Sequence, residues 1–211
     1  MSFPEPPRGG DAGTLTGVAV AIVAANDDPR GLGRVRLRYP WLETSGASRW
    51  ARIAVSMAGD DRGTYFLPEV GDEVLVAFED GDIDHPYVLG ALWNGEDEPP
   101  QGNADGDNDL RQIKSRSGHE LTFDDGDGGE AIRIETAGGH SVVMDDGDGT
   151  ITVEDTGGNE IEFDGDARSL TVSSEATVTI EAPHIEIKSA GNLDIEASGV
   201  LTLDGALITL N

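Results

Sequence analysis

The segment that begins at Leu170 has the sequence LTVSSEATVTIEAPHIEIKSAGNLDIEASGVLTLDGALITLN, and it repeats one short pattern up to Asn211. Each repeat contains two aliphatic residues two positions apart, and successive repeats begin 8, 7, 8, 8 and 7 residues apart. The pairs are Leu170/Val172, Val178/Ile180, Ile185/Ile187, Leu193/Ile195, Leu201/Leu203 and Ile208/Leu210. Residues at i and i+2 of a β-strand point to the same face, so each repeat predicts one short strand with one apolar face.

An eight-residue repeat is too short to bury its own apolar face. A single chain of such strands would leave open edges and an uncovered apolar surface, and single-chain β-helices use about 20 residues or more for each coil. We therefore predict that three copies of the chain wind together into an intertwined, triple-stranded β-helix needle. The expected trimer core comprises Leu170, Val172, Val178, Ile180, Ile185, Ile187, Leu193, Ile195, Leu201 and Leu203.

A longer repeat precedes these octads. The repeated phrases are Ser117–Asp125, Gly138–Asp146 and Gly157–Gly165. Their central glycines, Gly118, Gly139 and Gly158, are 21 and 19 residues apart. A period near 20 residues predicts hairpin-like excursions of the same trimer.

The first half of the chain has a different composition, because eight of the eleven aromatic residues lie between Tyr39 and Trp93. Alternating apolar runs bounded by turn residues predict five strands in this half, as in a small barrel of the OB type. The expected strands are Gly17–Ala24, Gly33–Tyr39, Trp50–Val55, Glu73–Phe78 and Tyr87–Leu92.

These patterns predict an all-β protein with four parts. Residues 1–13, rich in proline and glycine, are expected to form a flexible N-terminal arm. Residues 14–96 form the OB-fold domain, and residues 97–109 form a polar linker rich in turn residues. Residues 110–211 form the β-helical spike.

The chain carries 41 acidic and 14 basic residues, a formal net charge of -27. Such a surface repels phosphates, which argues against nucleic-acid binding. Because only two of the basic residues are lysines, we expect a halophilic host, in which a Debye length of about 3 Å at 1 M salt screens self-repulsion. The sequence contains no 18-residue apolar run and no signal-peptide pattern. We therefore expect that the protein is assembled in the cytoplasm and that it does not insert stably into a membrane.

Within the expected barrel, several segments in order resemble a known family. The matching segments are Asp28–Pro29, Gly33–Trp41, Trp50–Ile53, Ala58–Gly59, Phe66–Phe78, Gly81–Gly90 and Trp93–Gly95. They are similar to the OB-fold domain of VgrG proteins and of phage baseplate assembly protein V. The family motif residues are Gly33, Pro40, Trp41, Trp50, Pro68, Gly71, Asp72, Gly81, Asp82, Pro86, Gly90 and Asn94.

The resemblance implies a non-enzymatic homotrimer, the central spike in the baseplate of a contractile, phage-tail-like injection machine. The spike would belong to a virion tail or an injection particle, contact inner-tube and baseplate proteins, and be delivered outward on contraction. Larger VgrG proteins carry an N-terminal hub domain, so we expect a separate hub protein at the OB end. At the other end we expect a PAAR-like tip protein that contacts Ile208, Leu210 and Asn211.

Other functions fit parts of the sequence. The alternative is a glycan-binding or glycan-cleaving β-helical tail fibre, although 41 carboxylates would create glycosidase-like pairs by chance. The alternation of Arg34, Arg36 and Arg38 suits an OB nucleic-acid face, but a solvent or intersubunit face explains it better. His119 and His140 occupy equivalent repeat positions without a metal-binding motif. We expect no catalytic residues, no metal and no cofactor.

Overall fold

The computed structural model describes residues 15–42 and 46–209. It divides into two units, Met1–Ala104 and Asp105–Asn211, and the division falls within the segment 97–109 that the sequence predicts as a linker. The whole of the expected arm 1–13 and the expected tip contacts Leu210 and Asn211 lie outside the described residues.

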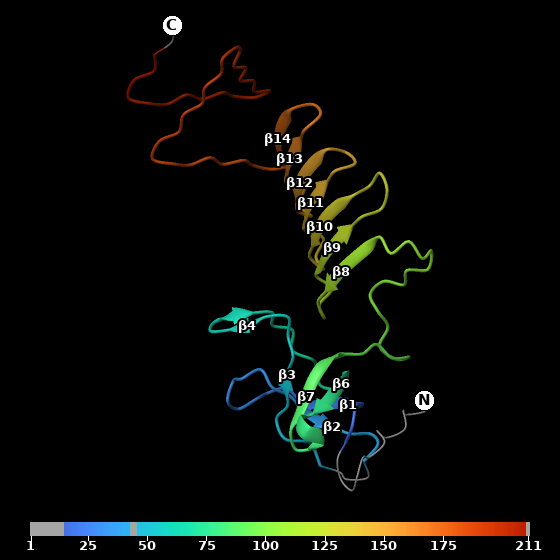
Figure 1. The fold of residues 1–211 in the computed structure, drawn as a ribbon. Helices are drawn as coiled ribbons and strands as arrows, with labels where there is room; N and C mark the ends of the chain where they lie inside the picture. Colours follow the sequence, from blue (N-terminus) through green and yellow to red (C-terminus); the bar gives the residue numbers. More distant parts are fainter. Residues whose placement is uncertain (1–14, 43–45, 210–211) are drawn as a thin grey trace. The chain divides into compact units, whose positions relative to one another are not determined.

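The first unit contains a five-stranded sheet and a small hairpin (Figure 1). The sheet strands are β1 (Val18–Ala25), β2 (Arg36–Arg38), β3 (Arg52–Ile53), β6 (Glu73–Phe78) and β7 (Pro86–Ala91). The hairpin consists of β4 (Ala58–Gly59) and β5 (Arg62–Gly63), and a 3-10 turn, Glu79–Gly81, connects β6 to β7. The strand order is β2-β1-β6-β7-β3, with β3 and β7 parallel and the other pairs antiparallel.

One bridge closes this sheet into a barrel. The N–H of Val35 donates to the carbonyl of Ala51 at 3.1 Å and the N–H of Ala51 donates to the carbonyl of Val35 at 2.7 Å. This antiparallel bridge joins the segments that lead into β2 and β3, the two outer strands of the order above. Five strands closed in this way form the OB-type barrel that the sequence predicts, so the all-β and OB-like assignments are confirmed.

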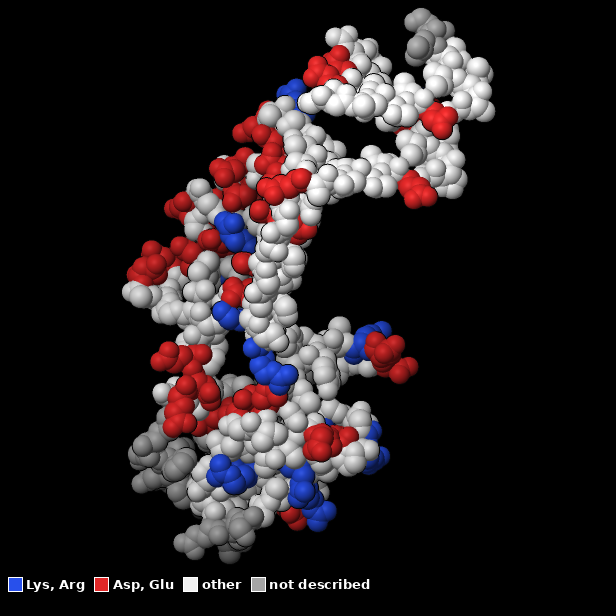
Figure 2. All heavy atoms as spheres, turned by 180° about the vertical axis from the view of Figure 1, so that it is seen from behind, with Lys and Arg blue, Asp and Glu red and all other residues white. Residues whose placement is uncertain are grey.

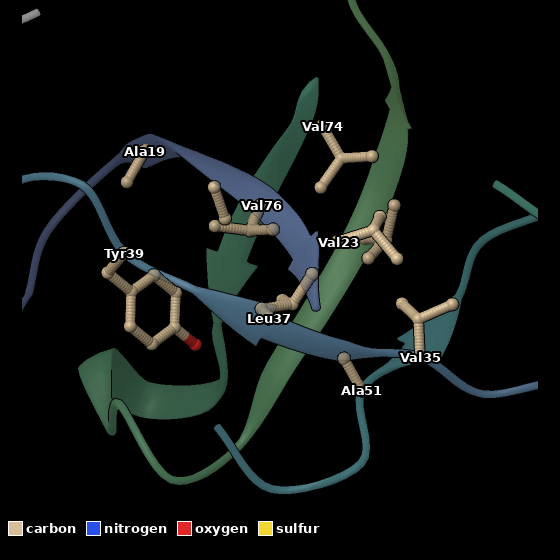
Figure 3. Packing of buried hydrophobic residues seen from close by; sticks show 10 residues of the cluster. Ala19, Val23, Val35, Leu37, Tyr39, Ala51, Val74 and Val76 are labelled. Carbon is tan, nitrogen blue, oxygen red and sulfur yellow. The ribbon is translucent and has the colours of Figure 1, made fainter. Parts of the chain in front are cut away.

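The barrel core is made mainly of alanine and valine side chains, with one leucine and one tyrosine, that point inward from the strands and the segments beside them. In β1 the buried residues are Ala19, Ala21 and Val23, and their neighbours point outward. The remaining buried core residues are Val35, Leu37, Tyr39, Ala51, Val74, Val76 and Val88. Figure 3 shows these side chains converging between the strands. Burial raises the pKa of Tyr39 to about 12, and its ring packs against those of Trp41 and Phe78.

An ion pair fixes the loop between β1 and β2. The Asp28 carboxylate accepts two hydrogen bonds from the Arg34 guanidinium, each 2.8 Å long, and two from the backbone N–H groups of Arg30 and Leu32, each 3.0 Å long. The Arg34 hydrogen bonds are the largest cause that holds the pKa of Asp28 well below its usual range. The same contact places the Arg34 guanidinium 5.9 Å from the centre of the Trp50 ring.

The second unit is a meander of seven strands, each five residues long and antiparallel to the next (Figure 1). They are β8 (Leu110–Lys114), β9 (Glu120–Asp124), β10 (Ala131–Glu135), β11 (Ser141–Asp145), β12 (Thr150–Glu154), β13 (Glu160–Asp164) and β14 (Ser169–Ser173). All six pairs run in register over five residues, without a bulge. The expected 20-residue repeat is one hairpin of this meander.

The turns at one edge of the meander share one hydrogen-bond pattern. These turns are Ser115–His119, Thr136–His140 and Asp155–Asn159. In each turn, a side-chain oxygen of the first residue accepts a hydrogen bond of 3.0 to 3.1 Å from the backbone N–H of the fifth. The fourth residue is Gly118, Gly139 or Gly158, with φ of 87°, 86° and 76°, a conformation that glycine adopts without strain. The repeat glycines are therefore required by the turns.

Within the described residues the octad segment, unlike the meander, does not form a sheet. Among residues 174–209 of the described chain there is no strand, and these residues are exposed apart from half-buried Ser174. The pair Leu170/Val172, which the sequence analysis placed first among the octads, lies in β14 and pairs with Phe163 and Ile161 of β13. The meander therefore extends one pair further than the octad pattern indicated.

The barrel core yields a prediction about stability. Replacing Leu37, which is fully buried, with alanine should lower the free energy of unfolding of the barrel by about 2–5 kcal/mol, because it leaves a cavity. The matched control, Leu89→Ala, removes the same atoms from a side chain that is 44% exposed and should cost well under half as much. All three tryptophans lie in this unit, so their fluorescence during denaturant unfolding measures the barrel alone. Equal losses in the two variants would contradict the core assignment.

Candidate functional site

The meander has one face that is almost entirely apolar. The in-register pairing places one side chain of each strand in each of two rows on that face. The first row contains Arg111, Phe123, Ile132, Met144, Ile151, Phe163 and Leu170. The second row contains Ile113, Leu121, Ile134, Val142, Val153, Ile161 and Val172. We call these two rows the apolar face.

The opposite face of the same sheet is polar and acidic. Its side chains alternate with those of the apolar face along every strand, and they include Glu120, Glu135, Glu160 and Glu162. Its ion pairs, such as that of Lys114 with Glu120 at 2.5 Å, are partly exposed and contribute little stability. Figure 2 shows acidic side chains spread over this unit beside a band without charged groups. The sheet is thus suited to water on one side and to an apolar partner on the other.

The apolar face is not covered within the chain. Phe163 is 47% exposed and Leu170 is 60% exposed, although both are large hydrophobic residues within the paired strands β13 and β14. Towards the last strands, Val142, Val153, Ile161 and Val172 line an open hollow of about 530 Å³ that also includes Val178 of the octad segment. A soluble monomer rarely exposes contiguous apolar area on this scale.

Arg111 is the single charged residue in the two rows. Its guanidinium donates hydrogen bonds to the backbone carbonyls of Asn108 and Asp109 at 2.9 and 3.1 Å and to the Asp125 carboxylate at 2.5 Å. The Arg111 guanidinium therefore lies at the β8 edge of the sheet, and the rest of the face is apolar.

The turn edge carries the groups that the sequence analysis considered for metal binding. His119 accepts a hydrogen bond at Nδ1 from the backbone N–H of Ala137 at 3.2 Å. Asn159 donates to Asp155 from its side-chain amide at 2.7 Å, and this bond lowers the pKa of that carboxyl. Within residues 15–42 and 46–209, no group of three or more histidine and acidic side chains is arranged to hold a metal ion. Nor does that part of the chain contain a helix long and apolar enough to cross a membrane.

The residues predicted for the trimer core fall into two sets. Leu170 and Val172 belong to the apolar face. Val178, Ile180, Ile185, Ile187, Leu193, Ile195, Leu201 and Leu203 lie in the octad segment, where all are exposed. The structure does not bring these octad pairs together within one chain. Ile208, predicted to contact a tip protein, is 49% exposed.

The sequence analysis missed the part of the apolar face that precedes Leu170. Its signal is the same pair of apolar residues at i and i+2 that marks the octads, in Leu121/Phe123, Ile132/Ile134, Val142/Met144, Ile151/Val153 and Ile161/Phe163. These pairs were hidden because the turns between their strands have four, five or six residues, so the pairs do not recur at one constant step.

The family motif residues of the barrel serve its architecture. Trp41 donates from Nε1 to the carbonyl of Val20 at 2.9 Å, and the carboxylate of Asp82 accepts from the backbone N–H of Asp84 at 2.9 Å. Gly33, Gly71 and Gly81 adopt positive φ of 63°, 108° and 78° in turns. The other motif positions lie in strands, turns or connecting segments of the same unit; they are Pro40, Trp50, Pro68, Asp72, Pro86, Gly90 and Asn94.

Comparison with known protein families agrees with this two-part architecture. Residues 19–93 match the type VI secretion system/phage-baseplate injector OB domain. Residues 131–211 match the phage baseplate V C-terminal trimerisation domain, which includes β10 to β14 and the octad segment. Together the two matches cover most of the barrel, most of the apolar face and all of the octads.

Curated relatives are similar to part of the chain. The type VI secretion system spike protein VgrG2a of Pseudomonas aeruginosa is 35% identical over 102 residues, covering 44% of this chain and 12% of that protein. VgrG5 of the same organism is 36% identical over 108 residues, covering 49% and 13%. VgrG3 of Vibrio cholerae is 31% identical over 110 residues, covering 48% and 11%. The alignments thus span only about an eighth of the length of these relatives.

The chain contains, in this order, a closed OB-type barrel, a meander with an uncovered apolar face, and a segment that matches the trimerisation domain. The chain belongs to the phage baseplate V and type VI secretion VgrG spike family, with an OB domain followed by a C-terminal trimerisation domain.

Proposed function

We propose that this chain forms the trimeric central spike of a contractile injection baseplate, and that its needle pierces the target envelope when the sheath contracts. The observation that carries the proposal is the apolar face, which is followed along the chain by octads whose aliphatic side chains are all exposed within residues 174–209. Three copies that turn these faces toward one axis would bury them together and expose only the acidic faces.

The accessible area of the chain supports association. The chain exposes 16085 Å², whereas two compact domains of half its 22.2 kDa mass would together expose about 11,000 Å². Stable protein interfaces bury about 1,200–2,000 Å² or more in total. The excess area is therefore large enough for an extensive interface between copies of the chain.

The apolar face would supply both cohesion and stiffness. Each half-exposed aliphatic or aromatic side chain that the trimer covers contributes about 1 kcal/mol, half of the value for full burial. The meander strands lie side by side about 4.8 Å apart, so the seven strands extend for about 29 Å. A shaft cross-linked by backbone hydrogen bonds along this length would transmit an axial force with little bending. We predict three kinds of partner for this shaft: a separate hub protein, a PAAR-like tip protein and inner-tube proteins.

A charge placed in the apolar face should break the trimer. The variant Ile151→Asp would place three carboxylates near one axis, and each unpaired buried charge costs several kcal/mol. The matched control, Thr152→Asp, puts the same charge one residue away on the polar face and should leave the trimer intact. Sedimentation equilibrium measures the molar mass, which is 22.2 kDa for a monomer and three times that value for a trimer. A trimer in both variants would contradict the orientation of the sheet.

The octads lead to a test of the piercing function. Ile195→Asp introduces three charges into the expected needle core, whereas Glu196→Asp changes a neighbouring acidic residue without a change of sign. We expect particles assembled with Ile195→Asp to lose most of their killing or delivery activity, or not to assemble, while those with Glu196→Asp retain it. Electron microscopy of the particles separates the two causes of loss. Full delivery by the Ile195→Asp particles, or binding of the unaltered chain to a glycan array, would favour the tail-fibre alternative.

A further inference from the structure

The hairpin of β4 and β5 extends from the barrel as an arm, which we define as Val55–Phe66 (Figure 1). Its strands are two residues long and are joined by the hydrogen bond from the N–H of Thr64 to the carbonyl of Met57 at 3.0 Å. Thr64 is half-buried and every other residue of the arm is exposed. An isolated two-stranded hairpin of this size is at best marginally stable in water, so the arm needs a partner surface.

The arm presents an apolar side. Met57 is 54% exposed, Tyr65 is 75% exposed and Phe66 is 63% exposed. With Leu32 and Val55 they line an open hollow of about 670 Å³ at the base of the arm. Aromatic and methionine side chains of this kind are enriched at protein interfaces.

The tip of the arm is acidic. Asp60 and Asp61 form the turn between β4 and β5. The neighbouring Arg62 lies across the hairpin over its pairing partner Gly59, where an added Cβ atom would meet its Nε at 2.6 Å. Two carboxylates and one guanidinium thus lie near the end of the arm, which leaves the tip with a negative balance.

The same barrel carries a hollow of about 600 Å³ that is lined by Arg34, Arg36, Arg49 and Arg52. Arg36 donates to the backbone carbonyl of Ser48 at 3.0 Å, and Arg49 faces Asp84 at 3.5 Å with 71% of its side chain exposed. Glu79 and Asp84 also line the hollow, and Arg34 is paired with Asp28. Four arginines against two carboxylates still give the lining a positive balance, in a chain of net charge -27. We call this surface the arginine hollow.

We propose that, in the trimer, the acidic tip of the arm of one copy docks in the arginine hollow of the next copy. This inference rests on the proposed trimer. The tip and the hollow are different surfaces, and such head-to-tail contacts close into a ring when the copies are related by rotation. Arg52 lines both the arginine hollow and the hollow at the base of the arm. The surface that would bind a neighbour's arm is therefore adjacent to the base of the barrel's own arm. The trimerised needles hold the barrels at a high local concentration, which lets a modest contact form.

The chain has no cysteine, so introduced cysteines can test the docking. The full-length variant Asp60→Cys/Arg49→Cys is treated with a short bis-maleimide, and covalent dimers and trimers are measured on denaturing gels. The matched control is Asp60→Cys/Val18→Cys, since Val18 is exposed on β1, which does not pair with β3. We expect linking in the first variant to be at least about tenfold faster than in the control. We also expect it to slow with added salt, because the contact is electrostatic.

Sedimentation of each variant separates this proposal from the one on which it rests. An intact trimer in which the Arg49 variant links no faster than the Val18 control would overturn the docking and leave the trimer standing. A monomer before cross-linking would overturn the trimer itself, and the docking with it.

Discussion

The second unit depends on one constraint, the burial of an apolar face that its own chain does not cover. Five-residue strands paired in register put two apolar side chains of almost every strand on one side of the sheet. Backbone hydrogen bonds hold this arrangement, so the side chains cannot turn inward as they do in the barrel. The free energy of burying these side chains is available only through association, and the octads add further exposed aliphatic side chains after the last strand of the meander.

The two units solve the burial problem in opposite ways. The barrel folds its sheet upon itself through the bridge of Val35 and Ala51, which leaves a core of small side chains inaccessible to water. The meander stays open, because its turns connect neighbouring strands directly and no other strand of its unit lies over the face within the described residues. The barrel therefore has a core within one chain, whereas the second unit belongs to a domain that trimerises.

The charge distribution determines which faces of the sheet can associate. Carboxylates occupy the polar face and the turns, while the apolar face holds a single charge, that of Arg111, which is turned to the edge. Residues 97–211 carry 26 acidic and 6 basic residues. Repulsion between acidic surfaces opposes lateral contact between finished needles, whereas the apolar faces remain free to meet. The barrel holds more arginines than the second unit, and four of them line one hollow together with Glu79 and Asp84.

The sequence by itself determined the fold class, the order of the two units and the need for more than one chain. These follow from local periodicity: the alternation in β1 and β6, the glycines at Gly118, Gly139 and Gly158, and the aliphatic pairs of the octads. Such patterns specify which side of a strand is apolar, because the side-chain period of two residues is a property of the backbone alone.

The tertiary structure decided what depends on pairing between distant residues. It assigned Leu170 and Val172 to the meander through their partners Phe163 and Ile161, and it aligned five earlier pairs into the same face. It also closed the barrel at Val35, joined Asp28 to Arg34, and left the arm of β4 and β5 uncovered beside the arginine hollow. The local pattern marks the apolar pairs but does not specify their partners, because the partners depend on which segments the folded chain brings together.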